Sequence, residues 1–128
     1  GAYAWHSFRR HDTPLAFGSD LIGYNWNLFY GLHSAITRQS TDSQPPGGWF
    51  PEEKLTVEES IRGYTTGAAY AAFLEDHAGS LEVGKWADLT VVDLDPFAVV
   101  AEDPAALLDG RVLMTWVAGE LIAGALSN

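Results

Sequence analysis

The feature that most constrains the fold of this chain is a short apolar run, Leu15–Phe17, which leads through Gly18 and Ser19 to the carboxylate of Asp20. A run of this kind is typical of a parallel β-strand that is covered on both faces. In parallel α/β folds, catalytic groups gather where such strands end. Asp20 is therefore the first candidate for a catalytic residue. An aspartate here can equally cap the turn or helix that follows.

The other predicted elements give this strand no obvious partner. A capping box formed by Thr56 and Glu59 marks one helix start, and a hairpin is predicted around Ala118 and Gly119. The pattern as a whole predicts helices at 3–11, 27–38, 56–64 and 68–74, strands at 89–94, 112–117 and 120–122, and a helical turn at 103–108. A single parallel strand cannot form a sheet. It either pairs with the later strands, or its neighbours lie in sequence outside this chain.

Size and composition limit the classes of function. The length of 128 residues suits one domain. The formal net charge of −10 argues against nucleic acid or an anionic membrane as the main partner, because so few cations cannot form a basic patch. The absence of cysteine rules out disulfides and thiolate zinc sites. With no signal peptide visible, this absence favours a cytoplasmic location.

Six short motifs occur in a characteristic order along nearly the whole chain. They are FGSD at 17–20, GWFP at 48–51, LTVEES at 55–60, YTTGAAY at 64–70, GSLEVGKWADL at 79–89 and DLDP at 93–96. Each motif alone is weakly specific, but together they resemble the C-terminal part of the metal-dependent amidohydrolases. The branch that they resemble most is the one called amidohydrolase family 3.

The resemblance implies an α/β fold, namely the C-terminal fragment of a (β/α)8 TIM barrel with part of a small accompanying β-sandwich. Residues 1–78 would be the end of the barrel domain, with Leu15–Gly18 as the last barrel strand and Asp20 at its tip. Residues 79–128 would return into the sandwich. Because a complete barrel needs about 200 residues or more, the chain is expected to be a fragment, with the other barrel strands upstream.

The same resemblance implies a hydrolase that acts on a small molecule. Members of this family cleave amide, ester or related bonds with water bound to one or two divalent metals, usually zinc. The metal lowers the pKa of its bound water. By resemblance, Asp20 takes the proton from that water, passes it to the leaving group, and also serves as a metal ligand.

The remaining metal ligands of the family cannot be found in this sequence. Those ligands include a His-x-His pair, whereas His6, His11, His33 and His77 show neither His-x-His nor His-Glu-x-x-His spacing. A catalytic zinc site needs about three protein ligands. The chain alone is therefore expected to bind no metal tightly and to be catalytically inert.

Two other functions stay open. The first is a non-enzymatic α/β association module, whose exposed apolar surface is covered by a partner or by a second copy in a homo-oligomer. Alternatively, Asp20 and His33 could form a small independent hydrolase if both reach one cleft. His33 is expected to pack in a helix and Arg38 to be an ordinary helix-end cation. The family often has a proline within two residues of the aspartate, whereas Leu21–Trp26 follows here, so relatives do not indicate the substrate.

Overall fold

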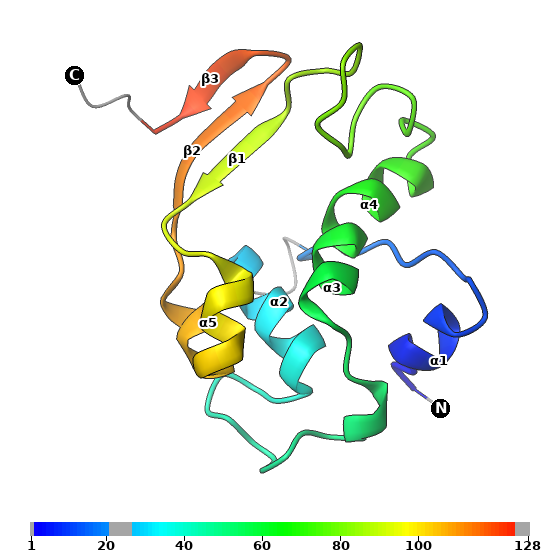
Figure 1. Ribbon diagram of the computed structural model, residues 1–128, viewed down its shortest axis with the longest axis vertical. Helices are drawn as coiled ribbons and strands as arrows, with labels where there is room; N and C mark the ends of the chain where they lie inside the picture. Colours follow the sequence, from blue (N-terminus) through cyan, green and yellow to red (C-terminus); the bar gives the residue numbers. More distant parts are fainter. Residues whose placement is uncertain (1, 21–26, 125–128) are drawn as a thin grey trace.

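The structure is a computed structural model that describes residues 2–20 and 27–124. Helices and loops make up the first two thirds of this part of the chain, and strands together with two short helices make up the last third (Figure 1). The elements in chain order are α1 (Trp5–Arg9), α2 (Leu28–Thr37), the 3-10 helix η1 (Pro51–Glu53), α3 (Val57–Tyr64), α4 (Thr66–Ala71), β1 (Leu89–Val92), α5 (Pro96–Glu102), the 3-10 helix η2 (Pro104–Asp109), β2 (Val112–Val117) and β3 (Glu120–Ala123). This order confirms the predicted mixture of helices and strands. Among the described helices, none combines the length and the apolar character needed to cross a membrane.

Local sequence signals position the two helices that matter most for the site. The side chain of Asn27 caps α2 by accepting a hydrogen bond from the backbone N–H of Phe29 at 3.0 Å. The predicted capping box of α3 is present, since the Glu59 N–H donates to Thr56 Oγ1 at 3.1 Å and the Thr56 N–H donates to Glu59 Oε2 at 3.0 Å. Both helix starts therefore follow from a few adjacent residues.

The core lies where α2 meets η2, α3 and α5. Phe29, Leu32 and Ile36 line one face of α2 and pack against the fully buried Leu107 of η2. A Cβ atom at Gly110 would lie 2.5 Å from the Phe29 ring, so only glycine fits where η2 ends against α2. The short elements after β1 therefore close the helical core.

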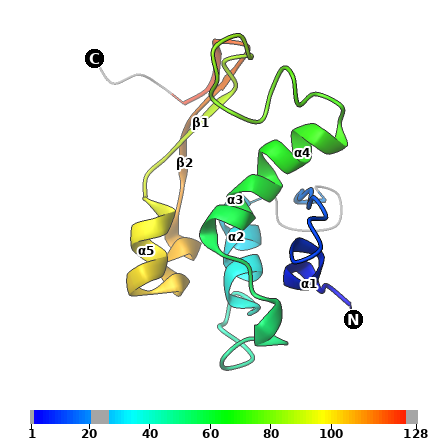
Figure 2. The ribbon, with the colours of Figure 1, turned by 45° about the vertical axis from the view of Figure 1, so that its right-hand side comes forward.

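The strands form one antiparallel sheet in the order β1-β2-β3. Leu89 pairs with Trp116 and Val91 with Met114 across β1 and β2. The turn between β2 and β3 has positive φ values at Ala118 (51°) and Gly119 (81°), as a two-residue hairpin turn that matches the strand twist requires. The predicted hairpin is confirmed. Figure 2 shows the sheet on one side of α3 and α4, and α1 on the other.

Three expectations from the sequence differ from the structure. The segment Leu15–Gly18 is not a strand, because a strand is defined by its hydrogen bonds to a neighbour and no described segment pairs with it. The helical break falls at Thr65, so α4 begins before Gly67. The helix α5 was not predicted, although Asp95 caps it through the N–H of Phe97 at 2.9 Å and Pro96 opens it. Residues 21–26, which depart from the family pattern after Asp20, lie outside the described residues.

Candidate functional site

Asp20 is exposed and lies at the end of the extended segment 13–20, which follows α1 without forming a helix or strand (Figure 1). Its φ of 50° places it in the left-handed region, which aspartate tolerates better than most residues. Asp20 makes no hydrogen bond or ion pair with the described residues. Within residues 2–20 and 27–124, no side chain or backbone group occupies this carboxylate.

Helices α3 and α4 hold the segment that leads to Asp20. The backbone N–H of Phe17 donates to the carbonyl of Gly63 at 2.9 Å, and the Phe17 ring lies 5.6 Å from that of Tyr64. A Cβ atom at Gly63 would lie 2.4 Å from the Phe17 ring, and one at Gly67 would lie 1.9 Å from the Leu15 carbonyl oxygen. The absence of side chains at these two glycines lets the extended segment lie directly on the helices.

His33 is a core residue and does not join Asp20. Its side chain is fully buried on α2, and neither ring nitrogen has a hydrogen-bond partner among the described residues. Burial lowers the pKa of His33, and the nearby charge of Asp103 raises it by less. An enclosed imidazole and an exposed carboxylate do not share a cleft that is open to substrate, so the structure does not support a hydrolase built on this pair.

A metal site is not formed by the described residues alone. In residues 2–20 and 27–124, no group of three or more histidine, aspartate or glutamate side chains is placed to hold a metal ion. His77 instead stacks on Trp86, with ring centroids 5.3 Å apart. The donor set that a catalytic zinc requires does not exist here, and Asp20 would be one isolated ligand.

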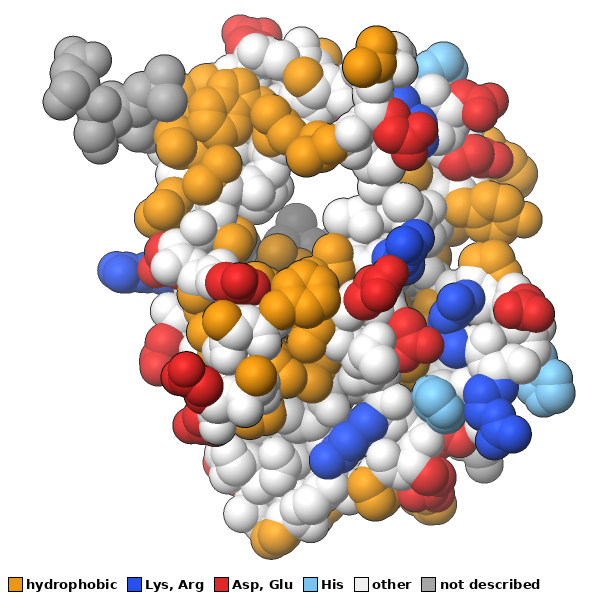
Figure 3. Space-filling model, in the orientation of Figure 1, with side chains coloured by type: hydrophobic (Ala, Val, Ile, Leu, Met, Phe, Trp, Pro, Cys, Tyr) orange, Lys and Arg blue, Asp and Glu red, His pale blue; other side chains and the backbone are white. Residues whose placement is uncertain are grey.

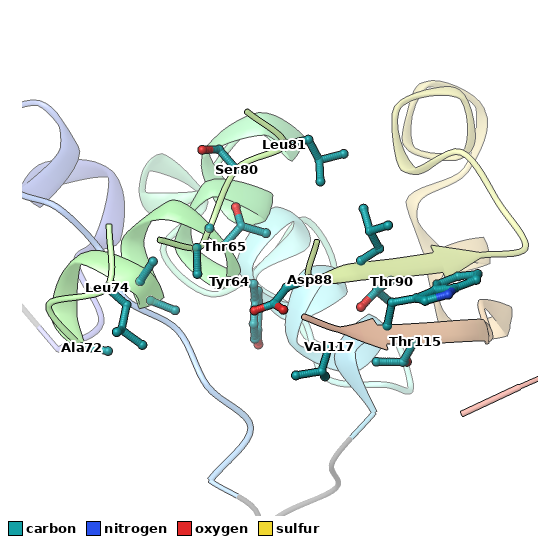
Figure 4. Close-up of a pocket in the computed structure, with 16 residues that line it drawn as sticks. Tyr64, Thr65, Ala72, Leu74, Ser80, Leu81, Asp88, Thr90, Thr115 and Val117 are labelled. Atoms are coloured by element: carbon teal, nitrogen blue, oxygen red, sulfur yellow. The ribbon is translucent and has the colours of Figure 1, made fainter. Parts of the chain in front are cut away.

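A groove of about 580 Å³ separates α3 and α4 from the sheet (Figures 3 and 4). Tyr64 and Thr65 lie on its helical side, and Thr90 and Val117 on its sheet side. Asp88, which also lines the groove, accepts a hydrogen bond from the Ala118 N–H at 2.7 Å, so its carboxylate stabilises the hairpin. The groove is an apolar packing surface rather than a chemical site.

A second hollow, of about 490 Å³, lies between α2 and the extended segment. Aromatic side chains dominate its walls, which comprise Tyr3, Trp5, Phe17, Gly18, Gly31, Ser34, Ala35, Arg38, Gln39, Trp49 and Tyr64. Arg38 is 9% exposed and lies over the Trp49 ring at 5.1 Å from its centroid. The sequence interpretation of Arg38 as an ordinary helix-end cation is wrong, because the turn carrying Trp49 folds back over it.

Comparisons with known proteins give a consistent result. The sequence profile of the amidohydrolase family matches residues 1–123. The protein LONG AFTER FAR-RED 3 of Arabidopsis thaliana is 30% identical over 122 residues, which are 93% of this chain and 19% of that protein. YtcJ of Bacillus subtilis, which is named as an amidohydrolase, is 32% identical over 121 residues, 94% of this chain and 22% of that protein.

A third relative carries a more specific name. The N-substituted formamide deformylase of Arthrobacter pascens is 38% identical over 90 residues, which are 70% of this chain and 16% of that enzyme. The chain thus spans about a fifth of the length of the curated relatives that it matches.

Proposed function

Because this chain belongs to the amidohydrolase family, we propose that it is the C-terminal part of a hydrolase that cleaves an amide, ester or related C–N or C–O bond of a small molecule. The match over residues 1–123 carries this proposal. The named deformylase among the relatives supports a carbon–nitrogen bond as the target. We assign residues 1–78 to the end of a TIM-barrel catalytic domain and residues 79–128 to a β-sandwich segment.

Asp20 is the residue that this chain would contribute to catalysis. Its carboxylate is exposed and has no described partner, while α3 and α4 fix the segment before it. A carboxylate in this position can accept a proton from an attacking water molecule and deliver it to the leaving nitrogen or oxygen. This role follows from the family resemblance and from the availability of the side chain.

The divalent metal that the resemblance implies does not fit the described residues alone. No described cluster supplies three ligands, whereas catalytic zinc sites use about three protein ligands and an open position. The metal, with zinc as the expected ion, would therefore depend on ligands outside the described residues. For the isolated chain we propose neither tight metal binding nor activity.

The test begins with the coding DNA upstream of the codon for Gly1. We expect the reading frame to continue for several hundred codons and to encode a His-x-His pair. In the protein encoded by that frame, Asp20→Asn should lower kcat by about 10²- to 10⁴-fold, the usual contribution of a positioned acid or base. Asp12→Asn is the matched control, since Asp12 is also exposed with a positive φ of 55°.

The isolated chain completes the test. Purified 128-residue protein, assayed on amide and ester substrates with added Zn²⁺, should be no more active than its Asp20→Asn variant. Metal-dependent turnover that disappears in Asp20→Asn would contradict the proposal that this chain alone is inactive. A start codon or a cleavage site immediately before Gly1 would contradict the enzyme proposal for this chain.

The second candidate function is association with a partner or a second copy. It is favoured by the apolar groove beside the sheet and by large side chains left in solvent, among them Phe73 (88% exposed) and Leu81 (77% exposed). Large exposed apolar patches on soluble proteins mark interaction surfaces. This candidate needs no catalytic group from the chain.

A further inference from the structure

The hollow between α2 and the extended segment has the composition of a small-molecule site. Five aromatic side chains, contributed by segments that are distant in the sequence, line a space of about 490 Å³. Small-molecule pockets commonly measure about 300–1,000 Å³ and combine apolar or aromatic walls with a few polar groups. The rings contact one another edge to face, as in Trp5 against Phe17 (5.7 Å between centroids) and Tyr3 against Trp49 (6.3 Å).

Arg38 is the polar group that distinguishes this hollow from a packing defect. Its Nε donates to the carbonyl of Trp49 at 3.0 Å, and its backbone is tied to both Ser34 and Trp49. The guanidinium is thus fixed in place. Its Nη2 atom is shielded from water and has no hydrogen-bond partner among the described residues.

No described carboxylate neutralises this cation at close range. Arg38 forms no ion pair within residues 2–20 and 27–124. Glu53 is near enough to sense its charge, but the pKa of Glu53 is lowered chiefly by hydrogen bonds from Ser7 and only last by Arg38. A buried guanidinium that lacks an anionic partner is costly, and an anion bound in the hollow beside Arg38 would reduce that cost.

We propose that this hollow binds a small carboxylic acid with a flat aromatic body. The carboxylate would pair with the guanidinium of Arg38, whose planar donors match carboxylate geometry. The ring would lie among the aromatic side chains, where stacked and edge-to-face contacts are favourable. This inference concerns a binding site and does not depend on the proposed hydrolase function.

The test compares benzoate with benzamide, which share a ring but differ in charge. Trp5 and Trp49 line the hollow, so titration of the 128-residue chain can be followed by tryptophan fluorescence. Benzoate should bind saturably and about tenfold more tightly than benzamide, because hydrogen bonds to charged groups are the stronger ones. Equal affinities, or no saturable binding of benzoate, would overturn the proposal.

Variants locate the site. Arg38→Gln should abolish the preference for benzoate, whereas Arg62→Gln should keep it, because Arg62 is exposed and pairs with Glu58 away from the hollow. If Arg38→Gln fails to fold, as judged by circular dichroism, Ser34→Phe decides the question.

Ser34 is exposed and lines the hollow, so a phenylalanine there should fill the space and weaken benzoate binding by about tenfold or more, since a bulky ring takes the place of the ligand. Thr41→Phe, at an exposed position outside the hollow, is the matched control. Unchanged benzoate binding in Ser34→Phe would place the ligand elsewhere and overturn the assignment.

Discussion

At the scale of single residues, the burial of His33 makes the stability of the chain depend on pH. Its imidazole is fully buried without a described partner, and burial lowers its pKa below the ordinary value of 6.5, with Asp103 opposing. As the pH falls below about 6.5, the unfolded chain therefore binds a proton that the folded chain resists. The free energy of unfolding should decrease over that range and level off below the folded-state pKa.

The measurement is urea unfolding of the wild type and of His33→Leu at pH 5 and pH 8. The wild type should lose more stability between these pH values than the variant does. Asp103→Asn keeps a capping side chain for η2 but removes the negative charge that raises the pKa of His33. This variant should therefore lose more stability between pH 8 and pH 5 than the wild type does. Equal pH dependence in wild type and His33→Leu would show that His33 is not the group responsible.

At the scale of elements, Gly63 and Gly67 allow the extended segment to lie directly on α3 and α4. A Cβ atom at Gly67 would lie 1.9 Å from the backbone oxygen of Leu15, and no rotamer change can relieve that contact. We expect Gly67→Ala to destabilise the chain by about 1–3 kcal/mol from overpacking, reduced by up to about 1 kcal/mol of gained helix propensity. Urea unfolding and proteolysis of the 13–20 segment measure the effect.

Gly18→Ala is the control for this prediction. Gly18 belongs to the same segment, but nothing lies within 4 Å of the position of an added Cβ atom. Its substitution should change stability by less than about 0.5 kcal/mol. A Gly67→Ala variant that is as stable as Gly18→Ala would mean that the segment does not lie against α4.

The elements also show which parts of the fold the sequence can predict. The capping box at Thr56 and the hairpin turn at Ala118 were predicted because each depends on adjacent residues. The strand predicted at Leu15–Gly18 does not form among the described residues, since strand pairing depends on distant neighbours. The helix α5 was missed because Asp95 and Pro96, which directly follow the strand predicted at 89–94, suit the end of a strand as well as the start of a helix.

The candidate site likewise has features that the sequence predicts and features that it does not. The sequence pattern placed Asp20 at the end of a buried strand, whereas the structure places it, exposed, after a segment that pairs with no described strand. The burial of Arg38 could not be predicted, because it results from the turn at Trp49 folding back across the helix end. Local chemistry is readable from a single sequence, whereas the enclosure of a charged side chain is a property of the folded chain.

At the scale of the whole molecule, apolar groups remain in solvent beside the groove. Leu81 is 77% exposed and lines it. We expect the chain to self-associate as its concentration rises, more so in high salt, which screens the repulsion of a net charge of −10. Sedimentation velocity over a concentration series measures this.

Leu81→Ser should weaken that association by about tenfold or more, the equivalent of one buried leucine side chain. Phe8→Ser, at a 48% exposed position on α1 on the far side of α3, is the control. A chain that stays monomeric at every concentration, or one that both substitutions affect alike, would count against association through the groove.

The groove also separates the β2–β3 hairpin from the helical core. Val92 at the end of β1 packs against the helical core, while β2 and β3 contribute no side chain to that core in the described part of the chain. The hairpin can therefore fray while the helices remain folded, as a separate cooperative unit. A substitution at the hairpin tip then alters the local opening of the hairpin, whereas a substitution at Phe29 alters the unfolding of the whole chain. A single melting temperature would record the effect at Phe29 and overlook the effect at the hairpin.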